Sequence, residues 1–315
     1  MAAAVIFDTD AGSDIDDLYA LALILNHPNL DLRGVTTVSG DTQARARLVA
    51  KLCRLAGRED VPVRAGIRIP QALLDRGVTL EMYRTNLTHT QFVYPDDPED
   101  GRTYADGVDF ILDALSAATE PITLVATGPW SNIAEVLRRA DEAQRAAIGC
   151  IALMGGEVHL LHAESNAAGD PEAVDVVLHR GLPTFVGTWS ITRELTFPID
   201  EVEALIGGAE TPFLRALYDC TRMWWGEGKK AKPGPVCYDV VPVFWAAGDR
   251  GSISCIRLDG VNVELNGRYT RGMTVVHPWA RMAAAAVETT GPGYVTVTDT
   301  IDAAALKRRY VELVV

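Results

Sequence analysis

The sequence predicts an α/β domain built on a mostly parallel central sheet with helices on both faces. Two observations carry this prediction. Up to residue 187, short apolar segments alternate with helical segments, which is the pattern of successive βαβ units. The apolar segments are nearly continuous, as expected for strands that are covered on both faces. Because no internal repeat, low-complexity tract or linker interrupts the chain, we expect one domain over residues 1–315.

The elements of this part follow from apolar periodicity and from residues that start or stop helices. The expected strands are Ala3–Phe7, Leu32–Val38, Pro62–Ala65, Ile122–Val125, Ile148–Leu153 and Thr184–Gly187. The expected helices are Ile15–Leu25, Thr42–Ala56, Gly107–Ala118, Ser131–Arg139 and Pro171–His179. Ser131 should cap its helix, Pro171 suits a first helical turn, and Gly181 suits the stop after it.

The chain changes character after about residue 200. The helices expected there are Glu201–Ile206, Thr211–Trp225, Asp239–Ala247 and Ala303–Val314, and strands are expected within Ile253–Leu265 and Met273–His277. The earlier segment Asp75–Arg102 is the exception to regularity, because it is polar and poorly periodic. Loops of that length inside compact domains are usually lids or binding loops, and we expect such a role here.

The overall charge restricts the partners. A formal net charge of -13 argues against nucleic acid and anionic membranes, which need clustered Lys and Arg, and leaves a neutral small molecule as the easier partner. No apolar run approaches the roughly 20 residues of a membrane span. The first residues lack the basic region of a signal peptide, and the five cysteines are scattered, so we expect a cytoplasmic protein.

The segment that follows the first predicted strand is unusually acidic. Residues 8–17 (DTDAGSDIDD) carry five carboxylates, and no Lys or Arg precedes Arg33. Acids at a helix N-terminus are favoured by the helix dipole, but that effect accounts for one or two such residues rather than five. Uncompensated, these charges would repel one another and be costly to desolvate. An all-oxygen ligand set therefore predicts a hard divalent cation, Ca²⁺ or Mg²⁺.

Polar groups also follow the other predicted strands where each one ends. They are Ser39–Asp41, Thr127, Met154–Gly156 and Glu164–Asn166. Ligands of open parallel sheets bind outside the carboxyl ends of the strands. We therefore expect Asp10, Asp41, Thr127 and Asn166 to lie near one edge of the sheet.

Six short motifs in order resemble the nucleoside hydrolases, the inosine-uridine-preferring hydrolase superfamily. Residues 8–17 resemble the longer form, D-T-D-x-G-x-D-I-D-D, of the signature usually written D-x-D-P-G-x-D-D. The other five are residues 126–134 (ATGPWSNIA), 154–156 (MGG), 163–166 (AESN), 170–173 (DPEA) and 270–275 (TRGMTV). The resemblance covers essentially the whole chain and implies a Rossmann-like α/β fold.

The resemblance implies hydrolysis of the N-glycosidic bond of ribonucleosides to ribose and free base, with a bound Ca²⁺. By position, the calcium ligands would be Asp10, Asp17, the backbone carbonyl of Thr127, and Asp239. Asp10 would also act as the general base that takes a proton from the attacking water. Asp16, Glu164 and Asn166 would bind the ribose hydroxyls.

The chain departs from the family pattern at two positions. Asp41 stands where many members have Asn, and it can still accept a hydrogen bond from a ribose hydroxyl. Tyr238 stands where the inosine-uridine type has a His thought to protonate the leaving base, and a Tyr with a pKa near 10 is a poor acid. The purine-specific branch has a stacking Trp there, so we expect Tyr238 to stack on the base and the enzyme to lean toward purines. His89, in the lid-like loop, is a further candidate for the base end, and Asp14 has no assigned role.

Two other functions remain open from the sequence. A haloacid dehalogenase-type phosphohydrolase also opens with D-x-D, but Gly12 stands where that signature requires Thr or Val. A catalytically silent nucleoside- or ribose-binding protein would explain the missing His. The resemblance also implies a homodimer or homotetramer.

Overall fold

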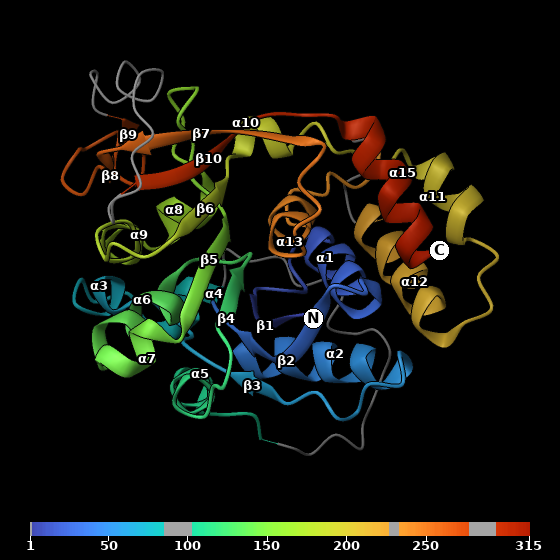
Figure 1. The fold of residues 1–315 in the computed structure, drawn as a ribbon, viewed down its shortest axis with the longest axis horizontal. Helices are drawn as coiled ribbons and strands as arrows, with labels where there is room; N and C mark the ends of the chain where they lie inside the picture. The colour runs from blue at the N-terminus through green and yellow to red at the C-terminus, as the bar shows by residue number, and fades with distance from the viewer. Residues whose placement is uncertain (1, 85–102, 227–232, 277–293) are drawn as a thin grey trace.

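A computed structural model describes residues 2–84, 103–226, 233–276 and 294–315. Within them, eight strands form one sheet in the order β3-β2-β1-β4-β5-β6-β10-β7 (Figure 1). The strands are β1 (Ala3–Thr9), β2 (Leu30–Thr37), β3 (Val63–Ala65), β4 (Ile122–Ala126), β5 (Ile148–Met154), β6 (Thr184–Gly187), β7 (Ile253–Asp259) and β10 (Tyr294–Ile301). Strand β7 runs antiparallel to β10, and the other neighbouring pairs are parallel. The predicted α/β fold with a mostly parallel sheet is confirmed.

Helices cover both faces of the sheet (Figure 1). One face carries α1 (Asp16–Asn26), α2 (Thr42–Leu55), α11 (Ile199–Ile206), α12 (Pro212–Gly226), α13 (Val240–Ala246) and α15 (Ala303–Val314), and the other α5 (Gly107–Ser116), α6 (Ser131–Arg139) and α9 (Pro171–Leu178). Alternate residues of β1 divide between the two cores: Val5 and Phe7 pack into the first, and Ala4 and Ile6 into the second. Burial on both faces explains why the strands are apolar almost without interruption.

Several elements differ from the sequence-based expectation. Strand β10 was not expected, yet it lies between β6 and β7 inside the sheet. The expected strand Ile253–Leu265 divides into β7 and β8 (Val261–Val263), and β8 pairs with β9 (Thr274–Val276) in a separate two-stranded sheet. Short helices also appear where none was expected, namely α3 (Gln71–Leu74), α4 (Leu80–Arg84), α7 (Glu142–Ala146), α8 (Ser165–Gly169) and α10 (Trp189–Thr192).

Two local expectations need correction. Ser131 does not cap α6, because it is the first helical residue and its hydroxyl donates to Asp170 at 2.6 Å instead. The expected lid-like loop Asp75–Arg102 is helical at α4 in its described part, and residues 85–102 lie outside the described chain. Pro171, in contrast, opens α9 as expected. In the described part of the chain, no helix has the length and apolar character needed to cross a membrane.

The strand order reverses on either side of β1, which has β2 on one side and β4 on the other. Such a reversal leaves a crevice at the carboxyl ends of the two central strands. The backbone N–H of Thr127 donates to the carbonyl of Asp8 at 2.9 Å, so the segments after β1 and β4 leave the sheet side by side. Asp10 and Thr127 therefore lie at the same edge, as predicted.

Close packing at this edge gives a test of the fold. A Cβ atom at Gly128 would lie 2.7 Å from Val38 Cγ1 and 2.9 Å from Asp10 Cβ. Gly128→Ala should therefore force the Asp10 loop outward and lower the free energy of unfolding by about 1–3 kcal/mol in urea titrations. Gly208→Ala is the matched control, because a Cβ there meets nothing within 4 Å. Equal stability of the two variants would contradict the packing described here.

Candidate active site

A cavity of about 500 Å³ opens at the carboxyl edge of the sheet. Carboxylates dominate one part of its wall: Asp10, Asp14, Asp16, Asp17, Glu164 and Asp239. Three aromatic residues form another part: Tyr83, Trp189 and Tyr238. The polar groups predicted to gather after β1, β4 and β5 are thus brought together.

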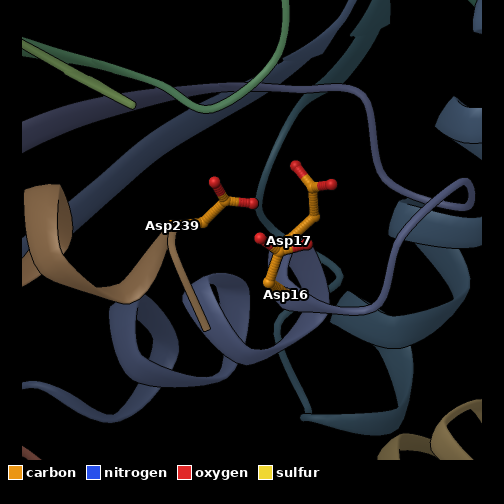
Figure 2. Close-up of side chains that lie close together, drawn as sticks. All are labelled: Asp16, Asp17 and Asp239. Carbon is orange, nitrogen blue, oxygen red and sulfur yellow. The ribbon is translucent and has the colours of Figure 1, made fainter. Parts of the chain in front are cut away.

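Three of these carboxylates form a compact group. Asp16 and Asp17 open α1, while Asp239 immediately precedes α13, and each has an oxygen within 4.8 Å of the others. Figure 2 shows the three side chains converging from the beginnings of these two helices. All three residues are at most 5% exposed. The first residues of α1 and the residue before α13, far apart in the sequence, therefore place three carboxylates side by side.

Two hydroxyl groups orient Asp17. The side chains of Thr9, at the end of β1, and Thr127, after β4, both donate to Asp17 Oδ1. The Thr127 carbonyl accepts a hydrogen bond from Asn166 Nδ2 at 2.7 Å. Thr127 thus contributes through its hydroxyl as well as its carbonyl, and the sequence had suggested only the carbonyl.

Asp8 is the one acid of the 8–17 segment that the described cavity wall lacks. It is fully buried, and its Oδ1 accepts hydrogen bonds from Thr36 at 2.6 Å and Asn132 at 2.7 Å. Burial raises its pKa to about 7. Asp8 therefore ties β1 to β2 and α6, which is a structural role.

The carboxylates of the cavity repel one another, and this repulsion adds to burial in raising their pKa values. Burial and the nearby Asp17 raise the pKa of Asp10 to about 8. Burial and neighbouring aspartates also raise the pKa values of Asp16 and Asp239 well above the ordinary range. Among the described residues, no Lys, Arg or His lines the cavity. Carboxylate oxygens gathered in a cavity without a cationic side chain among them are the type of ligand that a hard divalent cation prefers.

Arg45 is the cation closest behind this wall, and sequence reasoning missed it. Its side chain is fully buried and donates to the backbone carbonyls of Asp10, Ala11 and Ser39 and to the hydroxyl of Ser13. One guanidinium nitrogen lies 4.0 Å from the Asp10 carboxylate. Arg45 therefore fixes the path of the acidic loop and offsets part of its charge from outside the cavity. The only signal in the sequence was an Arg in the first turn of a predicted helix, where the dipole disfavours it, and that signal does not reveal which loop the side chain contacts.

The residues expected to bind a sugar differ in how freely they face the cavity. Asn166 lines it and is anchored at Thr127. Glu164 also lines it, but its two oxygens already accept from the N–H groups of Gly156, Asn166 and Ala167 and from the hydroxyl of Ser165. A sugar hydroxyl at Glu164 would therefore share an oxygen that holds α8 in place.

Two residues predicted to contact the substrate, Asp41 and His89, are not among the described residues that line the cavity. The Asp41 side chain caps α2 by accepting from the N–H of Ala44, and the described cavity wall contains Ser39 in its place. His89 lies outside the described residues. The base-end role expected for His89 and the sugar contact expected for Asp41 stay predictions.

The aromatic part of the wall was predicted only at Tyr238. Trp189, at the start of α10, has the Arg193 guanidinium 4.6 Å from its ring centroid and the His162 ring at 4.5 Å. Tyr83, in α4, bonds the Ser39 hydroxyl at 3.0 Å. Both residues belong to short helices that apolar periodicity could not detect, which is why they were missed.

Known proteins resemble this chain over nearly its full length. The family model described as inosine-uridine preferring nucleoside hydrolase matches residues 5–308. A pyrimidine-specific ribonucleoside hydrolase, RihA, of Enterobacter sp. (strain 638) is 31% identical over 285 residues, 88% of each chain. The solved plant nucleoside hydrolase PpNRh1 is similar with a TM-score of 0.79 at 24% identity, covering 100% of this chain and 99% of its own. A purine-preferring ribonucleoside hydrolase from Gardnerella vaginalis gives a TM-score of 0.78 at 22% identity, covering 99% and 98%.

The raised pKa values predict an unusual pH dependence for metal-free protein. Because the folded-state pKa of Asp10, about 8, lies above the ordinary value of 3.8, the folded state binds more protons than the unfolded state between those limits. The free energy of unfolding should therefore rise by about 1–2 kcal/mol as the pH falls from 8 to 6. Urea titrations in chelator at both pH values measure this.

The control is the same titration on two Asp→Asn variants. Asp16→Asn should remove part of the dependence, because burial and the neighbouring aspartates raise the pKa of Asp16 itself well above its ordinary value. Asp113→Asn, exposed on α5, should keep it. A stability that is independent of pH in the metal-free protein would show that the acids are not coupled as described.

Proposed function

Because the chain belongs to the inosine-uridine preferring nucleoside hydrolase family, we propose that its cavity binds a ribonucleoside together with Ca²⁺ and hydrolyses the N-glycosidic bond. Family membership makes the chain an N-ribosyl hydrolase and sets aside the phosphohydrolase and the catalytically silent binding protein. The observation that carries the proposal is the convergence of Asp10, Asp17 and Asp239 at the carboxyl edge of β1 and β4.

The donor set fits a calcium ion. Asp10, Asp17 and Asp239 offer carboxylate oxygens and Thr127 a backbone carbonyl, and these are the oxygen ligands that Ca²⁺ takes. The carbonyl of Thr127 has a second lone pair besides the one used by Asn166. When bound, the cation supplies Lewis acidity and a fixed position for the sugar diol.

The protein groups around that position account for ribose recognition. Asp16 and Asn166 line the cavity close to the proposed ligands. Because Asn166 Nδ2 already donates to the carbonyls of Thr127 and Met154, Asn166 can accept from a sugar hydroxyl through Oδ1, as Asp16 can through its carboxylate. Glu164 holds the start of α8 and hence Asn166. A sugar lacking a hydroxyl would leave one of these buried groups unpaired, which disfavours deoxyribonucleosides.

Asp10 is the proposed general base. Its raised pKa, about 8, belongs to the metal-free site, and a bound cation would hold the carboxylate ionised, which is the form that accepts a proton from water. Arg45 lies 4.0 Å from its carboxylate and holds its backbone, so the side chain has a defined direction. As the glycosidic bond breaks, positive charge develops on the sugar, and the surrounding carboxylates stabilise it.

The preferred base has to be found by a direct assay, because the similar proteins differ in the base that their names give. RihA relatives are named pyrimidine-specific, whereas the Gardnerella structure is named purine-preferring. The purine preference expected from Tyr238 therefore has no support from the sequence relatives. A panel of purine and pyrimidine ribonucleosides, assayed for free ribose with and without chelator, tests the activity and its metal dependence together. Asp10→Asn should lower kcat by orders of magnitude in that assay while keeping an oxygen ligand.

The cellular setting and assembly are part of the same proposal. We keep the expectation of a cytoplasmic homodimer or homotetramer, with no nucleic acid or membrane partner. The net charge of -13 supports the expectation that neither nucleic acid nor an anionic membrane is a partner. Light scattering of the purified protein gives the oligomeric state.

Removal of a proposed ligand should remove the metal. Asp17→Ala and Asp239→Ala should each abolish Ca²⁺ binding measured by isothermal titration calorimetry, and with it ribose release, because each takes an oxygen from the same site. Asp113→Ala should bind Ca²⁺ as the unmodified protein does. Tight binding in both ligand variants would show that the ion lies elsewhere.

Tyr238 should act through its ring. Stacking on a base needs only a π-face and is worth about 1–3 kcal/mol per base in single-strand binders, so Tyr238→Ala should lower kcat/KM about ten- to a hundredfold. Tyr238→Phe and Tyr238→Trp should keep most of it. If Phe is as damaging as Ala, the hydroxyl carries the function.

A further inference from the structure

Glu157, which follows β5, is a buried acid that the proposed mechanism does not use. It is 0% exposed and is not part of the described cavity wall. Its Oε1 accepts hydrogen bonds from the N–H groups of His159 at 2.6 Å and Leu160 at 3.1 Å. Its Oε2 accepts a hydrogen bond from the N–H of Ser190 at 2.7 Å. Removing a carboxylate from water is costly, and these three charge-assisted hydrogen bonds offset that cost.

The two oxygens of this carboxylate connect segments that follow neighbouring strands. One oxygen holds the turn after β5, and the other holds the second residue of α10, which follows β6. Thr188, at the N-cap of α10, forms no capping hydrogen bond through its side chain. The N–H of Trp189, the first helical residue, donates to the carbonyl of Gly156 at 3.1 Å. The first two N–H groups of α10, which have no partner within the helix, are therefore both bonded to the segment after β5.

Trp189 is the cavity residue that these contacts fix. Its side chain lines the cavity, and the two bonded N–H groups are its own and that of the next residue. His162, in the same segment as Glu157, places its ring centroid 4.5 Å from that of Trp189. The segment after β5 therefore determines where this aromatic part of the wall lies.

The surroundings of this contact are anchored separately. The N–H of Thr188 donates to the hydroxyl of Thr298, in β10, at 2.9 Å, and the Thr298 carbonyl accepts from His159 Nε2 at 2.8 Å. The backbone of Glu157 is held by Thr274, in β9, whose hydroxyl bonds both its N–H and its carbonyl. Loss of the side-chain bond to α10 should therefore shift this helix without opening the sheet.

We propose that Glu157 is a positioning residue for the base end of the cavity, and that it acts through Trp189. This inference rests on the proposed ribonucleoside hydrolysis and adds a residue that touches neither the substrate nor the metal. The proposed ligand Asp17 and the sugar-end residue Asn166 are held by other contacts, those with Thr9 and Thr127. Glu157 should therefore affect ligands that carry a base and leave the sugar and Ca²⁺ sites as they are.

Glu157→Asp separates the two halves of the contact. An Asp side chain readily accepts from N–H groups two and three residues ahead, so it should keep the bonds to His159 and Leu160. It is one methylene shorter, so it should lose the bond to Ser190. Glu157→Gln is the second variant, used if the first does not fold, because its length is unchanged but an amide NH₂ replaces one of the two acceptors.

Glu264→Gln is the matched control. Glu264 Oε1 also accepts from two backbone N–H groups, those of Asn266 and Gly267, and the residue is not part of the described cavity wall. A Gln oxygen can still accept both bonds, so this variant should behave as the unmodified protein does. An unchanged far-ultraviolet circular dichroism spectrum and an unchanged Ca²⁺ affinity check that the variants fold.

The first measurement separates kcat, KM and sugar binding. Glu157→Asp should raise KM for ribonucleosides about tenfold, the lower end of what stacking on a base contributes, with much less effect on kcat. The inhibition constant of D-ribose should stay unchanged. Combined with Trp189→Ala, Glu157→Asp should add no further loss, because no indole remains to be positioned. An unchanged KM, additive losses, or an equal rise in the inhibition constant of ribose would overturn the inference.

The second measurement follows Trp189 directly and needs no substrate. In protein labelled with fluorotryptophan, the fluorine NMR resonance that is lost in Trp189→Phe identifies this side chain. The resonance should shift or broaden in Glu157→Asp and stay in place in Glu264→Gln. An unchanged resonance in Glu157→Asp would show that Glu157 does not position Trp189, whatever the activity. Failure of the unmodified protein to release ribose from any ribonucleoside would instead end the proposed function, and the spectrum would still decide whether Glu157 positions Trp189.

Discussion

Mutual repulsion among buried carboxylates is the constraint on which the rest of this structure depends. The loop after β1 and the start of α1 place four aspartates against one cavity, and α13 begins beside a fifth. Burial alone would drive such groups to take up protons. The protein counters this with hydroxyl donors at Asp17 and with Arg45 behind Asp10. The negative charge that remains is what the proposed cation would neutralise.

The sequence was most informative where acidic or polar residues directly follow a predicted strand. Apolar strands, the acidic segment and the polar residues after β4 and β5 were enough to place Asp10, Thr127 and Asn166 together, because parallel strands end at a common edge. Asp41 was expected with them, but its side chain caps α2. Contacts between distant segments were not accessible in this way. Arg45 reads as an ordinary helical residue until the β1–α1 loop folds against it.

Short elements and alternating strands account for the other misses. Tyr83 and Trp189 belong to helices of five and four residues, too short to show a period. Ser131 looks like a cap by residue type, but its hydroxyl is engaged by Asp170 from a different helix. The two parts of the cavity wall differ in the same way. The aspartates come from the segment after β1 and from the beginnings of α1 and α13, whereas two of the three aromatic residues, Tyr83 and Trp189, come from the short helices α4 and α10.

The position of β10 has a consequence for how the chain reaches its folded state. This strand is close to the C-terminus, yet it pairs with β6 on one side and β7 on the other. During synthesis, β6 therefore remains an open edge of the parallel sheet until residues 294–301 have left the ribosome. An exposed edge of apolar strands is a template for pairing with other chains. The strand that closes this edge is thus made well after the βαβ units that it completes, and a chain shortened before residue 294 would leave β6 exposed.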